Sequence, residues 1–517
     1  MFPASVETTL DRPTPPAAFR IGYVDLLRML AAIIVMNGNF AKATIDNTTK
    51  SMPLDTPWGI LRDTNWAIVL LFMISGRVVA AAALPPPAAA SGGAPVPDYP
   101  HLVSSMFRRA FRFALPVIVV SFTQWMLCAK GHTSYASGAA QQEFNGSPAM
   151  IAGPAGWCTI NNFSGLLAFI VNLFTHNPVE PSSTPLRSQT QGSMLWTTTW
   201  AMWGSYTVYL TAFLTAQLAS NRYVIFAVLC AFSWVTYSYA WVFLLGYIIH
   251  DLSVHGHLGR PRSTLVAIVL QISCLAIAAL VVWIGPLRDG LRRGFRNIQI
   301  DQIAHNDMIS FPDTVSVFFF LMFFELSPRT QQFMSKTLFK HLGRLAAGVF
   351  VLHPIFLYTV IPRLAVTFHG TGAAAVAGVC WIVLFVLSLA AALVFFQLVE
   401  KPSVLLGRLV WSLLAKPVDD GTQAGNAVKG DRYALVAESN AAAGKGSGGG
   451  GQSQRMASAA PAAGPSSSYP SEATSSALAS SGTGRKRVSA SDMRNGGGVP
   501  PAVVEVLPVG PGVANTA

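Results

Sequence analysis

Residues 373–396 read AAAVAGVCWIVLFVLSLAAALVFF and carry no charged side chain. Three further stretches are equally free of charge, at residues 200–220, 223–249 and 264–284. About 20 mainly apolar residues are enough to cross the roughly 30 Å hydrocarbon core of a bilayer as a helix. Apolar residues fill these runs continuously rather than at every second position, and in lipid a backbone must satisfy its own hydrogen bonds. We therefore expect membrane-spanning helices rather than barrel strands.

The rest of the chain has the composition of a membrane protein. Its 517 residues are 52% hydrophobic and only 11% charged, whereas an ordinary soluble domain has about 25% charged residues. Candidate spans begin near Met29, Trp66, Phe113, Phe163, Trp200, Tyr223, Thr264, Thr314, Leu345 and Ala373. The runs from Phe163 and Thr314 are short enough to be re-entrant, and residues 223–249 are long enough for a kinked pair. The prediction is an all-α polytopic bundle of about ten transmembrane helices, plus or minus one.

The basic residues predict an orientation. The formal net charge is +12, but no nucleic-acid motif accompanies it, so membrane topology is the better explanation. If the N-terminus is cytosolic, alternating spans place most basic clusters in the cytosol, where the positive-inside rule expects them. These are Arg108, Arg109 and Arg112, Arg260 and Arg262, Arg329 to Arg344, and Lys401 with Arg408. The loop at residues 285–310 is an exception, because its four arginines fall on the opposite side.

The sequence also contains three glycosylation sequons and two end segments that differ from the apolar middle of the chain. Three glycosylation sequons, at Asn47, Asn145 and Asn162, fall in loops that this orientation places in the lumen of a secretory-pathway membrane or outside the plasma membrane. Residues 1–19 are polar and do not resemble a cleavable signal peptide. Residues 419–517 are rich in Gly, Ala, Ser and Pro, and bury too little apolar surface to offset the entropy of ordering. We expect a transmembrane domain at residues 20–410 and a disordered cytosolic tail.

The cysteines and histidines predict no metal site. The five cysteines have no metal-ligand spacing. Cys128 and Cys158 flank a loop, and form a disulfide if that loop faces an oxidising lumen. His250, His255 and His257 lie in one loop without a further ligand pattern.

The first span carries polar residues that an anchor does not need. Asp25 and Arg28 are three residues apart, so on a helix they share a face and can pair, and Asn39 lies deeper, where an amide needs a partner. The segment Asp25-Leu-Leu-Arg28-Met-Leu-Ala-Ala resembles the first span of the acyltransferase-3 family of integral membrane acyltransferases, which includes bacterial O-antigen acetylases and fungal members. Further landmarks follow in the family's order, at residues 71–76 (LFMISG), 107–116 (FRRAFRFALP), 195–210 (with Leu195-Trp196-Thr197), 341–353 (with Val351-Leu352-His353) and 399–403 (VEKPS).

This resemblance implies a reaction and two groups that carry it. Members of the family transfer an acyl group, often acetyl, from acyl-CoA to a hydroxyl, commonly on a carbohydrate. A hydroxyl is a poor nucleophile, so a base must take its proton. In the family that base is a His in the first span, assisted by a Glu near the Trp-Thr landmark. Here Asn39 stands at the His position and Ala201 at the Glu position, and an amide does not titrate usefully.

Two functions therefore stay open. One is an acyltransferase that uses another base, and the other is a catalytically degenerate relative that binds or moves a lipid or saccharide, or scaffolds a partner. An unrelated transporter predicts inverted repeats, which the sequence does not show.

His353 is the predicted replacement base, because an ionisable side chain in mid-span is costly to bury without a function. A neutral His353 bonded to a neighbouring helix carbonyl is the equally open alternative. Arg108, Arg109 and Arg112 either clamp the donor phosphates or anchor the third span at the cytosolic interface. Asp25, Arg28 and Trp196 complete the predicted set of substrate- and donor-binding residues.

Overall fold

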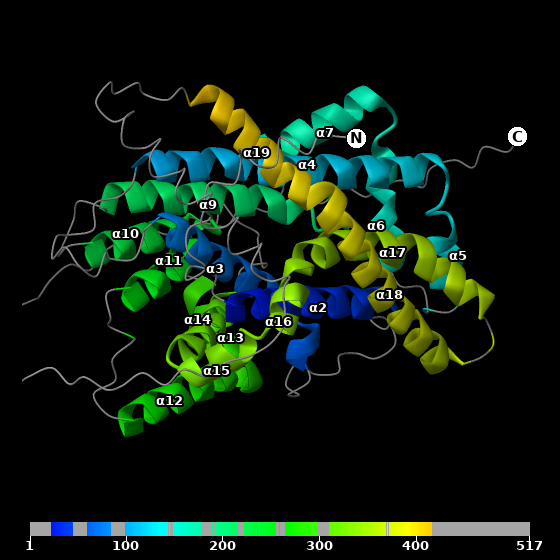
Figure 1. Ribbon diagram of the computed structural model, residues 1–517. Helices are drawn as coiled ribbons and strands as arrows, with labels where there is room; N and C mark the ends of the chain where they lie inside the picture. The colour runs from blue at the N-terminus through cyan, green and yellow to red at the C-terminus, as the bar shows by residue number, and fades with distance from the viewer. Residues whose placement is uncertain are drawn as a thin grey trace, which may run out of the picture. The chain divides into compact units, whose positions relative to one another are not determined.

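The computed structural model describes residues 22–44, 59–83, 99–142, 144, 148–176, 189–190, 192–215, 222–236, 238–254, 258, 264–296, 310–368, 370 and 372–415 (Figure 1). Within these ranges every regular element is a helix, as the sequence predicts. The predicted end segments 1–19 and 419–517 lie outside the described residues, and so do Asn47 and Asn145.

The bundle is built from apolar helices of two lengths. The longer ones are α2 (Gly22–Thr44), α3 (Thr64–Ala83), α4 (Tyr99–Ala129), α9 (Trp196–Thr215), α12 (Thr264–Trp283), α17 (Ala346–Thr367) and α18 (Ala373–Phe395). The shorter ones are α7 (Phe163–Thr175), α10 (Arg222–Val235), α11 (Ala240–Val254) and α14 (Phe311–Glu325). Among the described helices, six are long and apolar enough to cross a membrane, or seven if α14 and the following α15 (Pro328–Met334), which meet at 90°, form one broken span. The chain is therefore an integral membrane protein.

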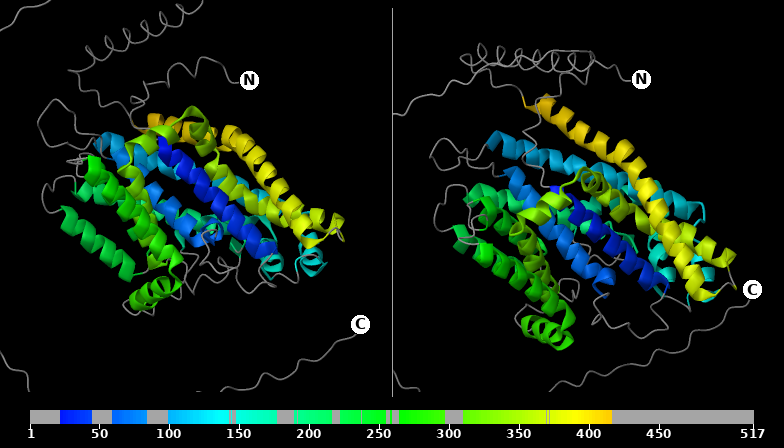
Figure 2. Two further views of the ribbon diagram at one scale, coloured as in Figure 1. Left: turned by 90° about the horizontal axis from the view of Figure 1, so that it is seen from below. Right: turned by 60° about the horizontal axis from the view of Figure 1, so that its bottom comes forward.

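Shorter elements connect these helices. They are η3 (Gly59–Arg62), α5 (Tyr135–Gln142), α6 (Pro148–Ala155), η4 (Trp157–Thr159), α13 (Gly285–Arg296) and α16 (Thr337–Arg344). After α18 the chain continues through a π-helical turn, η6 (Phe396–Glu400), into α19 (Lys401–Leu414). Together these three form the long yellow-to-orange rod at one side of the bundle (Figures 1 and 2).

Contacts between helix ends define two faces of the bundle. The arginine face is the end where Arg108 of α4 and Arg408 of α19 line one pocket. The disulfide face is the opposite end, where Cys128 in the last turn of α4 is bonded to Cys158 of η4. α2, α4 and α17 each run from the arginine face to the disulfide face, and α3, α14 and α18 run back.

The short run from Phe163 forms α7, an apolar helix of 13 residues. α7 starts near the disulfide face, where Phe163 packs 6.5 Å from the ring of Trp125. Its last turn bonds to α9, with the indole Nε1 of Trp203 donating to the carbonyl of Phe174 at 3.2 Å. α7 therefore packs against α4 and α9, and it is shorter than the helices that are long enough to span.

Residues 223–249 form the predicted pair of helices, α10 and α11. Arg222 at the start of α10 lies 3.2 Å from Asp251 near the end of α11, so the two helices are antiparallel. At their other ends Trp234 and Trp241 both pack on Phe311, at 6.1 and 6.2 Å. Among the described residues the helices of spanning length therefore number six or seven rather than the predicted ten or so, and α7, α10 and α11 are shorter apolar helices.

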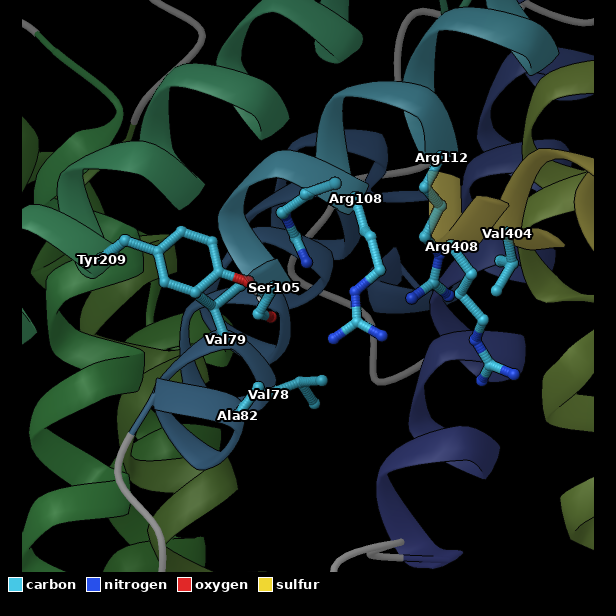
Figure 3. Close-up of a pocket in the computed structure, with 10 residues that line it drawn as sticks. Val78, Val79, Ala82, Ser105, Arg108, Arg112, Tyr209, Val404 and Arg408 are labelled. Atoms are coloured by element: carbon cyan, nitrogen blue, oxygen red, sulfur yellow. Dashed lines mark hydrogen bonds between the residues drawn. The ribbon is translucent and has the colours of Figure 1, made fainter. Parts of the chain in front are cut away.

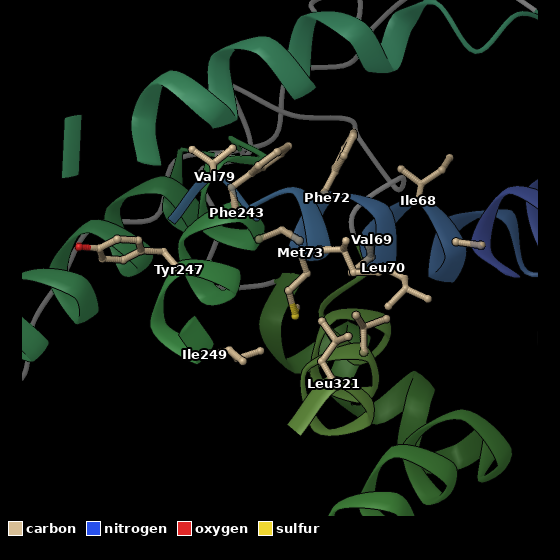
Figure 4. Close-up of a cluster of buried hydrophobic side chains, with 14 of the residues drawn as sticks. Ile68, Val69, Leu70, Phe72, Met73, Val79, Phe243, Tyr247, Ile249 and Leu321 are labelled. Atoms are coloured by element: carbon tan, nitrogen blue, oxygen red, sulfur yellow. The ribbon is translucent and has the colours of Figure 1, made fainter. Parts of the chain in front are cut away.

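α3 lies at the centre of the largest apolar cluster (Figure 4). Its side chains Phe72 and Met73 pack against α11, and the rings of Phe72 and Phe243 stack at 5.0 Å. Gly76 and Gly246 allow the two backbones to touch, because a methyl group on either glycine would overlap the facing main chain. Small residues are the usual means of close helix packing in a membrane, where burial alone gives little driving force.

The disulfide predicts how many cysteines react with a thiol reagent before and after reduction. Cys128 and Cys158 are joined with their Cα atoms 5.4 Å apart, and Cys230, Cys274 and Cys380 are free. Disulfides form in oxidising compartments, so we expect the unfolded, unreduced protein to take up maleimide at three sites and the reduced protein at five. A mass shift of five labels without reduction would show that the disulfide face lies in a reducing compartment.

The arginine-rich loop that broke the positive-inside rule is partly neutralised. Arg288 of α13 lies 2.7 Å from Asp63 and 2.7 Å from Asp313, at the start of α14. Burial lowers the pKa of Arg288, but the charges of Asp313 and Asp63 outweigh this effect and the pKa is raised. This ion cluster ties α13 to η3 and α14, and it involves only one of the four arginines of the loop.

Candidate functional site

The structure joins two of the predicted residues in the interior of the bundle. His353 lies in the second turn of α17 with 0% of its surface exposed. Its Nε2 is 3.0 Å from the side-chain amide nitrogen of Asn39 on α2. The position where the family has its histidine is thus in direct contact with the residue predicted to replace that histidine, although 314 positions separate them in sequence.

A second hydrogen bond fixes the tautomer of this ring. Nδ1 of His353 lies 3.0 Å from the carbonyl oxygen of Val349, one turn earlier on α17. A carbonyl can only accept, so Nδ1 carries the hydrogen and donates it. Nε2 therefore carries the lone pair and accepts from the amide of Asn39. The carbonyl belongs to α17 itself and not to a neighbouring helix, and the contact of His353 with a neighbouring helix is the one with Asn39 of α2.

The neighbours of this pair come from the start of α9. The amide nitrogen of Asn39 is also 4.0 Å from the sulfur of Met194. Two residues later Trp196 begins α9 and packs against Tyr239 at 6.2 Å. Ala201, at the family's Glu position, is partly buried against the central apolar cluster. The structure therefore packs Trp196 and Ala201 against the central apolar cluster.

The arginines predicted to clamp phosphates line an open pocket of about 180 Å³ on the arginine face (Figure 3). Arg108, Arg109 and Arg112 come from α4, and Arg408 joins them from α19. The pocket is completed by Ser105, Tyr209, Val404 and residues of α3. Figure 3 shows the guanidinium groups of Arg108 and Arg408 directed into the same space.

No carboxylate in the described part of the chain lies within salt-bridge distance of these four arginines. Nε of Arg109 is buried and has no hydrogen-bond partner among the described residues. Arg108 donates to the carbonyl oxygen of Ser104 at 3.1 Å, and Ser105 and Tyr209 share a hydrogen bond of 2.8 Å. Guanidinium forks match the geometry of phosphate, so this pocket has the chemistry of an anion site.

Asp25 and Arg28 lie between the pocket and the buried pair. They form the predicted i,i+3 ion pair, at 3.6 Å. Arg28 is within electrostatic range of Arg109 and of Glu400 in the π-helical turn η6. One oxygen of Glu400 is buried without a hydrogen-bond partner among the described residues. The charged groups at the start of α2 thus continue the arginine pocket toward the bundle interior.

Sequence reasoning missed several members of this site. Arg408 was assigned only a topological role, and Glu400 was noted only within the closing motif. Met194 gave no signal, because an apolar residue before a helix is unremarkable. Glu325 lies at the end of a helix, where the sequence alone suggests a solvated side chain, yet only 3% of its side chain is exposed and it pairs with Arg77. His176, which also lies near a helix end, is exposed.

Asn162 is exposed near the disulfide face, where its side-chain oxygen accepts from the backbone of Gly165 and caps α7. Within the described residues no group of three His, Cys, Asp or Glu side chains is placed to hold a metal ion. His255 and His257 lie outside those residues.

Comparison with known proteins gives one match. The acyltransferase domain that defines the acyltransferase-3 family matches residues 21–397. No curated protein and no solved structure is significantly similar to the chain. The matched region runs from the start of α2 into η6 and includes Asn39, His353 and the arginines of α4. Since the match covers most of the chain, and the helices are those of an integral membrane protein, the chain belongs to the acyltransferase-3 family of membrane acyltransferases.

Proposed function

We propose that this protein transfers an acyl group from acyl-CoA to the hydroxyl of an acceptor such as a carbohydrate, with His353 as the general base. The observation that carries the proposal is the bond between His353 and Asn39. It places a basic nitrogen beside the position where the family has its own base. A neutral imidazole whose other nitrogen is held by a carbonyl is oriented for proton transfer.

The proposed chemistry follows from the tautomer. The side chain of Asn39 turns away from Nε2, and the acceptor hydroxyl takes its place. As the hydroxyl oxygen bonds to the thioester carbonyl carbon, its proton moves to Nε2. The carbon–sulfur bond then breaks, and the imidazolium returns the proton to the CoA thiolate. The released amide of Asn39 can donate to the carbonyl oxygen as charge develops on it.

The arginine pocket is the proposed site of the donor phosphates. Four guanidinium groups, with no carboxylate within salt-bridge distance among the described residues, would neutralise the phosphates of CoA. Arg28, near the pocket, and Asn39 are eleven residues apart on α2, which is about 16–17 Å along a helix axis. This distance suits an extended pantetheine arm, so a donor held in the pocket would present its thioester at His353.

The two faces of the bundle support an orientation for this reaction. The disulfide and the exposed sequon at Asn162 lie on one face, and oxidising compartments favour both features. The arginine pocket lies on the other. We therefore place the arginine face and both termini in the cytosol, and the protein in a secretory-pathway or plasma membrane.

Donor binding is tested by removing two guanidinium groups. Arg108→Ala combined with Arg112→Ala should raise the KM for acyl-CoA about 10²- to 10⁴-fold, since hydrogen bonds to charged groups contribute about 1.5–3 kcal/mol each and every 1.4 kcal/mol is a factor of ten. The measurement is acyl transfer by the purified protein over a range of donor concentrations. Arg329→Ala, an exposed arginine of α15, is the matched control and should leave this KM unchanged.

An unchanged donor KM in the double variant would contradict the phosphate clamp. It would leave the arginines as anchors at the membrane interface. Absence of transfer from every acyl-CoA tested, with a range of hydroxyl acceptors, would overturn the proposed function.

A further inference from the structure

The segment Gly192–Leu195 is buried against the proposed catalytic pair. Ser193, Met194 and Leu195 are 2%, 6% and 1% exposed, although connecting segments usually run over the surface. The sulfur of Met194 lies 4.0 Å from the amide nitrogen of Asn39, and that nitrogen is itself 3.0 Å from Nε2 of His353. Met194 is thus one contact away from the nitrogen that would take the acceptor's proton.

Hydrogen bonds hold this segment in place. The hydroxyl of Ser193 accepts from Nε2 of Gln124 at 3.2 Å and from the backbone of Leu195 at 3.1 Å. The backbone of Ser193 donates to the carbonyl oxygen of Thr190 at 2.9 Å. Gln124 lies in the part of α4 that leads to the disulfide face.

A series of close contacts also links the segment Gly192–Leu195 to α6 and α17. Gly192 has φ +71° and is packed so closely on Gly153 of α6 that a Cβ would lie 2.5 Å from its Cα. Gly153 is packed just as closely on the ring of Tyr358. Tyr358 in turn meets Trp157 edge-on at 5.6 Å. The segment therefore joins Asn39, through Met194, to α6, through Gly192.

We propose that Gly192–Leu195 closes the acceptor's path to His353 and that Met194 determines which acceptors fit. This inference rests on the proposed function. If the donor occupies the bundle from the arginine face, the acceptor hydroxyl reaches Nε2 from the remaining side, where Met194 is the neighbour of Asn39. The segment has no charged side chain, so it fits a neutral hydroxyl compound better than a charged one. An unbranched thioether adapts its shape to what it contacts.

Kinetics on the Met194 variants separate this role from a structural one. Met194→Ala should shift the ratio of kcat/KM between a bulky and a small acceptor about tenfold or more toward the bulky one, as the loss of a few heavy atoms from a pocket does. The KM for acyl-CoA should stay unchanged. Met322→Ala, a partly buried methionine of α14, should alter neither quantity. Equal changes in acceptor and donor KM, or an unchanged acceptor ratio, would overturn the proposal.

A labelling experiment tests the path without relying on activity. Met194→Cys is introduced after Cys230, Cys274 and Cys380 have been replaced by serine, and sealed vesicles are treated with a charged, membrane-impermeant thiol reagent from either side. We expect labelling from the disulfide face, and about tenfold faster labelling when Gly192→Ala is added. That factor corresponds to about 1.4 kcal/mol, within the cost of a non-glycine residue at positive φ.

Labelling only from the arginine face, or a rate that Gly192→Ala does not change, would overturn the closing role of the segment. Because this result does not depend on acyl transfer, it distinguishes failure of the inference from failure of the proposed function.

Discussion

Replacing His353 with glutamine lowers kcat for acyl transfer about 10²- to 10⁴-fold, the range expected when a general base is lost. Glutamine keeps a polar side chain that can bond to Asn39 and to Val349, but it has no nitrogen that takes up a proton near neutral pH. The KM values for donor and acceptor should change much less than kcat, because the base acts mainly in the transition state. The measurement is steady-state transfer with both substrates varied.

Two controls test whether a loss of kcat in His353→Gln comes from the missing base. His250→Gln changes another buried histidine, on α11, and should leave kcat unaltered. The thermal stability of His353→Gln, followed by size-exclusion chromatography after heating, should match that of the unaltered protein. If His353→Gln retains the original kcat, then His353 is not the base and the proposed mechanism is wrong.

The family's own catalytic groups offer a complementary variant. Asn39→His together with Ala201→Glu restores both residues that the family uses. If the unaltered protein shows no transfer and only this double variant does, the chain is a degenerate relative rather than an active enzyme. Activity in the unaltered protein that depends on His353 supports the opposite conclusion.

Replacing Glu325 with alanine should destabilise the folded protein by about 3–5 kcal/mol, because it leaves a buried charge without its partner. Nε of Arg77 donates to Glu325, and so does the hydroxyl of Tyr23. The guanidinium also lies over the ring of Tyr23, at 5.5 Å from its centre. These contacts join α2, α3 and α14 at the arginine face, so the loss should appear as a large fall in the melting temperature of the detergent-solubilised protein.

A double-variant cycle assigns this loss to the ion pair. Arg77→Leu and Glu325→Leu should each be about as harmful as Glu325→Ala, whereas Arg77→Leu combined with Glu325→Leu should recover most of the stability, since no charge is then left buried. Arg293→Ala, an exposed residue of α13, serves as a neutral control. Additive losses in the combined variant would show that the two side chains do not depend on each other.

The sequence predicted the membrane fold well because hydropathy is a local property. An uncharged run such as residues 373–396 must be a helix in lipid whatever it packs against. The ordered landmarks likewise predicted the family. Two runs were left ambiguous, since composition marks neither where α7 ends nor the turn between α10 and α11. The predicted count of about ten exceeds the six or seven helices of spanning length among the described residues, because α7, α10 and α11 are shorter than a span.

The site was predicted as separate residues and not as an arrangement. Arg108, Arg112 and His353 could be named from charge and depth alone, because charged or ionisable side chains are rare in spans. Their partners could not be named. Glu325 near a helix end has the sequence context of a solvated residue, and only the fold buries it against Arg77.

The amino-acid sequence by itself determined that this chain is a helical membrane protein, which family it resembles, and that Asn39 stands where that family has its base. The tertiary structure alone decided that His353 reaches Asn39, that Arg408 joins the arginines of α4, and that Met194 contacts Asn39. The physical reason is the range of the interactions. A span is specified by about 20 consecutive residues in contact with lipid, whereas a bond between residues 314 positions apart depends on how every helix between them packs.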